Sequence, residues 1–235
     1  MSAIVIIPAR GSSKRVPRKN IRLLAGRPLL EWTIIVARKG TRDVPVIVST
    51  EDDEIATVAR NAGAEVVARP AALAKDDAST EAVLLHVLDA RRDSGFEDPD
   101  WVACLPPTSP FRRIDTLRQF MQMTDKSDVD CLLSVTETRG DFWHPQSDGN
   151  WERLFPDAPR RQQDRDSLFE ENSAYYMTRI SSLRETGSIL GHRRLGVPID
   201  PIEAMDINTP NDLVIAEALV TAGLGIDTAL MAELD

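Results

Sequence analysis

Cysteine and histidine are scarce in this chain of 235 residues, which holds two cysteines and three histidines. Cys104 and Cys131 sit in the apolar runs WVACL and DCLLSV, and the sequence has no CxxC pair. These absences argue against a disulfide framework and against a structural zinc site. We therefore expect two buried, reduced thiols, as is typical of a cytoplasmic protein.

The few histidines show neither the order of a Ser–His–Asp triad nor the spacing of a metal site. His86 falls on the apolar side of a helical pattern, so we expect a structural histidine with satisfied hydrogen bonds. His144 lies beside Trp143 and is a candidate for a substrate contact or for packing, whereas His192 in GHRR is expected to be solvated.

Long hydrophobic runs are absent as well. No apolar stretch approaches the roughly 20 residues that a helix needs to cross a bilayer. The run AIVIIP near the start is too short for a signal peptide and has no basic flank before it. We expect a soluble, cytoplasmic protein without a membrane partner.

Positive charge is in the minority, with 28 Lys and Arg against 37 Asp and Glu and a net charge of −9. This balance argues against a general nucleic-acid-binding surface, although it leaves room for a local basic pocket. One stretch stands out: residues 6–20, IIPARGSSKRVPRKN, carry five cations directly after an apolar run that ends at Pro8. These cations are Arg10, Lys14, Arg15, Arg18 and Lys19.

The hydrophobic pattern predicts one large α/β domain over residues 1–235. β-branched runs alternate with segments of helical spacing, which favours a Rossmann-like, doubly wound, mostly parallel sheet with helices on both faces. Strands are predicted over 3–7, 44–50, 64–69, 101–107, 130–137 and 171–178. Helices are predicted over 28–39, 52–63, 79–93, 113–123 and 211–223, with a possible cap at Ser79 or Thr80.

Residues 138–168 break this alternation with a segment rich in Asp, Arg, Gln, Trp and Pro. A segment of this length inside a compact domain is usually functional or part of an interface. WHP and NWERLF within it are compatible with a short hairpin.

The basic stretch lies where doubly wound folds bind ligands, at the carboxyl end of a strand. The backbone N–H groups of Gly11, Ser12 and Ser13 could form an anion-binding concavity, with Arg10 and Lys14 adding charge. The spacing matches neither a P-loop nor GxGxxG. An anionic ligand such as a nucleoside triphosphate fits it, and a solvated basic loop is the alternative.

Several blocks carry a family resemblance. ARGSSKRVPRKN closely resembles the N-terminal signature of the acylneuraminate cytidylyltransferases, which are CMP-sugar synthetases. Further blocks similar to that family follow in its order: IVSTEDDEIATVARNAGAEVVARP, LAKDDAST, LPPTSPFR, RRQQD with ENSAYYM, and AMDINTPNDL. Each block is weak alone, but the ordered set spans residues 3–213. The resemblance implies a sheet of the nucleotide-diphospho-sugar transferase type.

The resemblance also implies a reaction, the transfer of CMP from CTP to the anomeric hydroxyl of a 3-deoxy-2-keto sugar acid with release of pyrophosphate. It implies that Arg10 and Lys19 are catalytic together with Asp206. The residues that it assigns to substrate binding are Ser13, Lys14, Asn20, Ser79, Thr80, Thr108, Ser109, Arg161, Gln163 and Asn172. Such transfers depend mainly on positioning and charge neutralisation, which a basic loop and a divalent cation supply.

The metal assignment rests on Asp206 and Asn208. In the family, two aspartates of a DID motif share one side of an extended segment and bind Mg²⁺, a hard cation that prefers oxygen ligands. This chain reads Asp206–Ile207–Asn208, so the second carboxylate is replaced by an amide. An amide oxygen still coordinates but carries no charge, and Asn208 cannot act as a base. A plain turn role for these residues is the alternative.

The sugar side departs from the family pattern. Pro106 stands where a glutamine usually precedes PTSP, and Glu170 stands where sialic-acid enzymes can carry an arginine. Arg161 and Gln163 remain candidates for the sugar carboxylate and hydroxyls, and Asn172 for a hydrogen bond to the sugar. These departures favour a nonulosonic acid with substituents other than those of N-acetylneuraminate.

Three other functions stay open at this point. One is a cytidylyltransferase for an eight-carbon keto-deoxy acid, and another is a nucleotide-binding protein that has lost catalysis through Asn208. A structural interaction protein is the third, but it gives no reason for the ordered blocks. The resemblance also implies a homodimer in which residues 138–168 exchange contacts, with Trp143, Trp151, Leu154 and Phe155 supplying apolar area. A lid that folds on its own domain is the alternative for this segment.

Overall fold

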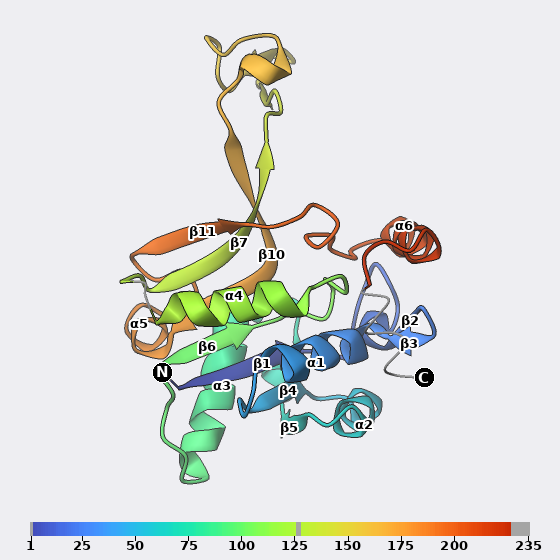
Figure 1. Cartoon of the computed structure of the whole chain (residues 1–235), viewed down its shortest axis with the longest axis vertical. Helices are drawn as coiled ribbons and strands as arrows, with labels where there is room; N and C mark the ends of the chain where they lie inside the picture. Colours follow the sequence, from blue (N-terminus) through green and yellow to red (C-terminus); the bar gives the residue numbers. More distant parts are fainter. Residues whose placement is uncertain (1, 126–127, 227–235) are drawn as a thin grey trace.

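The computed structural model describes residues 2–125 and 128–226, and its centre is a seven-stranded sheet in the order β11-β7-β10-β6-β1-β4-β5 (Figure 1). β1, β4, β5 and β6 run parallel, and β11 runs parallel to β7. β10 is antiparallel to both of its neighbours, β6 and β7. The strands span Ala3–Pro8 (β1), Val46–Thr50 (β4), Glu65–Ala68 (β5), Trp101–Cys104 (β6), Cys131–Thr138 (β7), Leu168–Arg179 (β10) and Arg194–Pro198 (β11).

Helices cover both faces of this sheet. α1, α2 and α4 pack on one face, and α3 and α5 pack on the other. The helices span Leu29–Gly40 (α1), Asp53–Asn61 (α2), Thr80–Asp93 (α3), Ile114–Thr124 (α4), Ile180–Thr186 (α5) and Pro210–Thr221 (α6). Short 3-10 turns span Lys19–Ile21 (η1), Ala71–Ala74 (η2) and Gln162–Asp164 (η3). The fold class predicted from the alternation of strands and helices is confirmed.

Strand β1 shows why the sheet is buried on both sides. Val5 and Ile7 point into the cluster under α1, α2 and α4, whereas Ile4 and Ile6 point into the cluster under α3 and α5. Successive strand residues face opposite sides, so a continuous apolar run suits a sheet covered on both faces. Burying each such side chain contributes about 1.5–3 kcal/mol. β1 is therefore a rigid support for the loop that follows it.

The helix ends follow from local side chains. Asp52 accepts hydrogen bonds from the N–H groups of Glu54 and Ile55 and so caps α2. The predicted cap at Ser79 is also present, because its Oγ accepts from the N–H of Ala82 at 3.1 Å. These caps fix the two helices that begin near the carboxyl ends of β4 and β5.

The segment expected to break the alternation projects from the sheet. β7 and β10 continue beyond the sheet core as two long strands that rise to the top of the view in Figure 1. Near their ends, β8 (Trp143–Pro145) pairs antiparallel with β9 (Trp151–Arg153). We call residues 138–168 the excursion. Arg153 donates to Asp141 at 3.0 Å and Arg165 donates to it at 3.2 Å, so one carboxylate holds the excursion together.

Some predicted elements differ in extent or were missed. The strand predicted over 101–107 ends at Cys104, because the proline pair that follows cannot donate to a ladder. The hairpin of β2 (Leu23–Leu24) and β3 (Arg27–Pro28), helix α5 and strand β11 were not predicted. The expectation that His86 is satisfied was wrong, since its buried Nδ1 lacks a hydrogen-bond partner among the described residues. Within the same ranges, no helix is long and apolar enough to span a bilayer.

Candidate active site

A cleft of about 530 Å³ opens at the carboxyl ends of β1 and β6. Four segments form its walls: the loop after β1, the turn between η2 and α3, the loop after β6, and the segment before α6. The lining residues are Pro8, Arg10, Ser12, Ser13, Lys14, Arg15, Lys19, Asn20, Asp76, Pro106, Pro107, Thr108 and Asn208. The structure therefore brings together much of the basic stretch, Thr108 and Asn208, which lie far apart in the sequence.

The loop after β1 is held by two kinds of contact. Asn20 is buried, and its Nδ2 donates to the carbonyl of Arg10 at 2.8 Å, which closes the loop on itself. The Arg10 guanidinium donates to Asp76 at 2.7 Å, and Lys14 forms an ion pair with the same carboxylate. Hydrogen bonds from Lys14 and then Arg10 lower the pKa of Asp76. Asp76 thus occupies the position in front of these cations that an anionic ligand would take.

The predicted backbone concavity is only partly available. The N–H of Gly11 donates to a Glu51 carboxylate oxygen at 2.7 Å, so this donor already has an anionic partner. The expectation that Gly11 contributes to an anion site together with Ser12 and Ser13 therefore stays a prediction, and it requires Gly11 to exchange the Glu51 carboxylate for the ligand. A Cβ at Gly11 would lie 2.5 Å from the Asp52 carboxylate, which explains why glycine is needed at this close approach.

Lys19 connects two walls of the cleft. Its Nζ donates to the carbonyl of Ile207 at 2.9 Å, across 188 positions of sequence. Burial is the largest cause of the lowered pKa of Lys19, Asp206 opposes this effect, and Arg15 adds to it. Lys19 is therefore a cation placed between the basic loop and the segment proposed to bind metal.

Asp206 and Asn208 flank a fixed residue. Ile207 is fully buried, and its N–H donates to the carbonyl of Thr108 at 2.8 Å. Asn208 Nδ2 donates to one carboxylate oxygen of Asp206, and its Oδ1 accepts from Arg15 at 3.4 Å. The two side chains consequently lie next to each other, as expected of alternate residues in an extended segment.

The donor set fits a magnesium ion shared with a ligand. The other carboxylate oxygen of Asp206, Oδ1, is buried and lacks a hydrogen-bond partner among residues 2–125 and 128–226. The same ranges contain no group of three or more His, Cys, Asp or Glu side chains that could hold a metal ion alone. Mg²⁺ commonly takes one or two carboxylates together with substrate phosphates and waters. An orphaned carboxylate oxygen beside a basic cleft matches that pattern.

Four further residues predicted from the sequence, Ser79, Thr80, Ser109 and Asn172, are not among the residues that line the cleft. Ser109 is a buried residue of the loop after β6, and its Oγ has no partner in the described part of the chain. Ser79 and Thr80 lie at the start of α3 outside the lining of the cleft. Asn172 accepts from Ser134 Oγ at 2.5 Å and donates to Thr136 Oγ1, so its amide is engaged within the sheet.

Arg161 and Gln163 are not brought to the cleft of their own chain. Both are exposed and lie in the excursion, beside or within η3. Figure 1 shows the excursion rising away from the ends of β1 and β6. Neither side chain lines the cleft, so the structure does not bring these two predicted residues to the other site residues.

Sequence reasoning named Arg15 among the basic residues without giving it a role, and it did not single out Asp76, Arg112 or Glu203, although all four side chains shape the site. Asp76 lies in LAKDDAST and Arg15 in the basic stretch, so charge alone could have pointed to them. Arg112 and Glu203 are buried beneath the walls. Their role depends on contacts between distant segments, for which the sequence holds no local signal.

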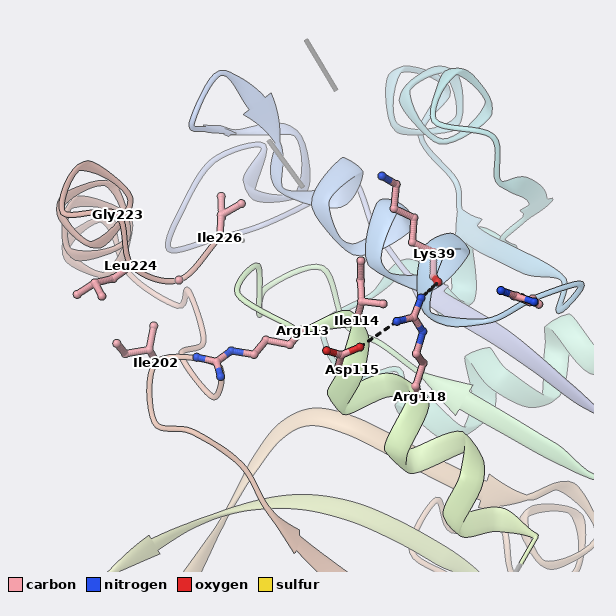
Figure 2. A pocket seen from close by; sticks show the side chains of 11 residues that line it. Lys39, Arg113, Ile114, Asp115, Arg118, Ile202, Gly223, Leu224 and Ile226 are labelled. Carbon is pink, nitrogen blue, oxygen red and sulfur yellow. Dashed lines mark hydrogen bonds and ion pairs between the residues drawn. The ribbon is translucent and has the colours of Figure 1, made fainter. Parts of the chain in front are cut away.

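A larger hollow of about 830 Å³ lies elsewhere (Figure 2). It is lined by the end of α1, the start of α4 and residues 223–226, and shares no lining residue with the cleft. Arg118 donates to Asp115 at 2.9 Å and to the carbonyl of Lys39 at 3.2 Å. This hollow is basic, but it lacks the strand-end position, the carboxylate–amide pair and the loop of the first cleft.

Comparisons with known proteins agree with this geometry. A family model described as cytidylyltransferase matches residues 4–205. The chain is 30% identical to the CMP-N,N'-diacetyllegionaminic acid synthase of Legionella pneumophila, over 94% of this chain and 97% of that protein. It is 29% identical to the N-acylneuraminate cytidylyltransferase of Escherichia coli O18:K1:H7, over 91% of this chain, but it spans only 51% of that longer protein.

A solved structure shows the same fold. The CMP:2-keto-3-deoxy-manno-octonic acid synthetase complexed with CTP matches with a TM-score of 0.65 at 17% identity. The match covers 95% of this chain and 100% of that one. The basic loop, the neighbouring carboxylate and amide, and the parallel strand ends therefore occur in a fold that cytidylyltransferases share.

Proposed function

Because this chain belongs to the acylneuraminate cytidylyltransferase family, we propose that it transfers CMP from CTP to the anomeric hydroxyl of a nonulosonic acid. The anomeric oxygen forms a bond to the α-phosphorus, and the bond from that phosphorus to the leaving pyrophosphate breaks. The hydroxyl proton is released to solvent. The single observation that carries the proposal is the cleft in which Lys19 lies between a basic loop and the segment of residues 206–208.

The cations of the loop after β1 bind the triphosphate in this proposal. Arg10 and Lys14 leave their ion pairs with Asp76 and pair with phosphate oxygens instead. Lys19 stays anchored near the carbonyl of Ile207 and stabilises the charge that develops on the leaving pyrophosphate. Ser13 and Asn20 complete the loop, and Asn20 keeps its shape through the Arg10 carbonyl.

Asp206 and Asn208 would hold Mg²⁺, and the unpartnered Asp206 oxygen supports this assignment. When bound, the ion would neutralise phosphate charge next to the reacting phosphorus. Asn208 contributes only a neutral oxygen, so the affinity for the ion is expected to be modest. The sugar acid lies towards Thr108 and the bulge of β10 near Asn172.

We further propose that two copies assemble through the excursion. Its surface carries exposed aromatic and aliphatic side chains, among them Trp151 at 64% exposure. Trp143, Leu154 and Phe155 lie close to it in the sequence and are exposed as well. Arg161 and Gln163 would then reach the cleft of the second copy. Light scattering should give twice the mass of one chain, and Trp151→Glu should halve it; a wild-type mass of one chain would contradict the assembly.

A pyrophosphate-release assay tests the transfer. The protein is given CTP and Mg²⁺ with N,N'-diacetyllegionaminic acid, N-acetylneuraminic acid or 2-keto-3-deoxy-manno-octonic acid, and a reaction without sugar acid is the control. We expect release that depends on a nine-carbon acid, fastest with the diacetylated one. Release with the eight-carbon acid alone would replace the proposed substrate class. CTP binding without any release would support the alternative of a nucleotide-binding protein, which the amide of Asn208 favours.

A further inference from the structure

The loop after β6 contains a buried arginine near its end, just before α4. Arg112 is 4% exposed and does not line the cleft. Its guanidinium donates to the carbonyls of Pro106 at 2.7 Å, Ser109 at 2.8 Å and Ala174 at 2.5 Å, and to Thr33 Oγ1 at 3.2 Å. Four of the five N–H donors of an arginine are thereby used.

These bonds connect three separate elements. Pro106 belongs to the cleft wall, Ala174 lies in the same bulge of β10 as Asn172, and Thr33 lies in α1. Burial lowers the pKa of Arg112 to about 10, so the guanidinium is still charged at neutral pH. A buried charge is costly unless its donors are satisfied, and here the satisfying groups are backbone carbonyls of the walls.

A buried glutamate likewise holds the wall formed by the segment before α6. Glu203 is 2% exposed and lies three positions before Asp206. Its carboxylate accepts from the N–H of Arg113 at 2.9 Å, from Thr116 Oγ1 at 3.0 Å and from Tyr175 Oη at 2.5 Å. The turn that leads into the Asp206–Asn208 segment is thereby tied to the start of α4.

Tyr175 joins the two charges into one cluster. Its ring lies 5.6 Å from the Arg112 guanidinium carbon, and its hydroxyl donates to Glu203. The resulting chain of contacts runs from the loop after β6, through Arg112, Tyr175 and Glu203, to the segment before α6. A hydrogen bond from the N–H of Ile207 to the carbonyl of Thr108 also joins these two walls directly.

We propose that Arg112 and Glu203 are positioning residues that hold the loop after β6 and residues 204–208 in register across the cleft. This inference rests on the proposed function, because it gives these walls the task of aligning the sugar acid and the Asp206 side chain. Most contacts of the nucleotide loop involve neither residue, because they are made with Asn20, Glu51 and Asp76. Lys19 and Arg15 of this loop also bond to residues 207 and 208, so the loop touches one of the two walls. Misplacing a reacting group by about 1 Å can cost about a hundredfold in rate.

Directional bonds explain why charged residues occupy these buried places. Apolar side chains of similar volume would provide stability but would not fix the orientation of carbonyl groups. Arg112→Lys keeps the charge but provides donors from a single nitrogen, which cannot reach carbonyls on opposite sides. Glu203→Gln keeps the shape and one acceptor oxygen but removes the charge that strengthens its three bonds.

Two variants and one control test the proposal by amide hydrogen exchange. We measure exchange at Ile207, whose N–H bonds to Thr108, in the wild type, Arg112→Lys, Glu203→Gln and Thr178→Val. Thr178→Val removes a buried hydrogen bond to the carbonyl of Ile189, on the sheet face covered by α3 and α5. We expect exchange at Ile207 to be about tenfold faster in both cluster variants and unchanged in the control, with β1 amides protected in all.

Kinetics provide the second readout. Each cluster variant should lose about tenfold or more in kcat with the sugar acid, while the CTP dissociation constant stays within about twofold. Thr178→Val should lower the melting temperature and keep both constants. Wild-type exchange at Ile207 together with wild-type kcat in Glu203→Gln and Arg112→Lys would overturn the proposal. If the wild type transfers CMP to no acid, the proposed function fails, and the exchange result still decides whether the cluster holds the walls.

Discussion

Replacing Asn208 by aspartate should turn the attraction between the side chains of residues 206 and 208 into a repulsion. In the structure the Asn208 amide donates to an Asp206 oxygen, and both side chains are partly buried. Asn208→Asp removes this donor and places a second negative charge beside the first. Without a divalent cation the two carboxylates repel each other, and Arg15, 3.4 Å from Asn208 Oδ1, offsets part of that repulsion together with Lys19.

The magnitude follows from these contacts. Losing a hydrogen bond to a charged group costs about 1.5–3 kcal/mol. Two like charges about 4 Å apart cost between about 1 and 4 kcal/mol, depending on how far water screens them. Attraction to Arg15 returns part of this, so we expect a net loss of about 2 kcal/mol in the free energy of unfolding. For a chain of this size that lowers the melting temperature by about 4–8 °C.

Thermal melts in EDTA and in Mg²⁺ with CTP test this expectation at pH 8. In EDTA, Asn208→Asp should melt below the wild type. With Mg²⁺ and CTP, the variant should recover the loss and need about tenfold less Mg²⁺ for half of the effect, because the new ligand is charged. Asn208→Ala is the control, since it loses the hydrogen bond without adding charge and should show little recovery. Equal melting of the wild type and Asn208→Asp in both buffers would refute the reasoning.

Three further outcomes are expected. Lys19→Met should lower kcat/KM by about a hundredfold or more, with a small change in melting temperature, because the cation facing the leaving group is lost while only one hydrogen bond to Ile207 disappears. Asp76→Asn should tighten CTP binding by about threefold in calorimetry at low salt, since the carboxylate competes with phosphate for two cations; weaker binding would show that Asp76 instead shapes the loop. Arg18 and backbone donors lower the pKa of Asp52, so its charge stabilises the fold above the ordinary value of 3.8 and this contribution is lost as pH falls through the lowered pKa. In urea titrations the gap of about 1 kcal/mol between wild type and Asp52→Asn at pH 7 should therefore close towards pH 3, and a gap that is constant with pH would be inconsistent with that linkage.

Local patterns in the sequence were sufficient to predict the frame of the sheet. The β-branched run of β1, the acidic start of α2 and the cap at Ser79 each carry a signal within a few residues. β10 was predicted as a shorter strand, because its polar first half, residues 168–173, is largely exposed and lacks an apolar pattern. β11 was missed because Arg194, Leu195 and Gly196 are exposed at the sheet edge, so the sequence there lacks the apolar pattern of a buried strand.

The site was predicted in its charges but not in its contacts. The cations after β1 stand out in an acidic chain, and their position at a strand end predicts a ligand site. The ion pairs of Arg10 and Lys14 with Asp76 depend on how the turn between η2 and α3 folds. The hydrogen bond from Lys19 to the carbonyl of Ile207 joins residues that are 188 positions apart in the sequence. Arg112 and Glu203 bond largely to backbone carbonyl and N–H groups. Every residue type carries such groups, so the sequence does not indicate these partners.

The most direct test of the account is a crystal structure of this protein with CTP. The account predicts that the triphosphate lies in the cleft at the end of β1, within hydrogen-bond distance of Arg10, Lys14 and Lys19. Phosphates bound instead in the hollow of Figure 2 beside Arg113 and Arg118, with Lys19 still bonded only to protein, would contradict it.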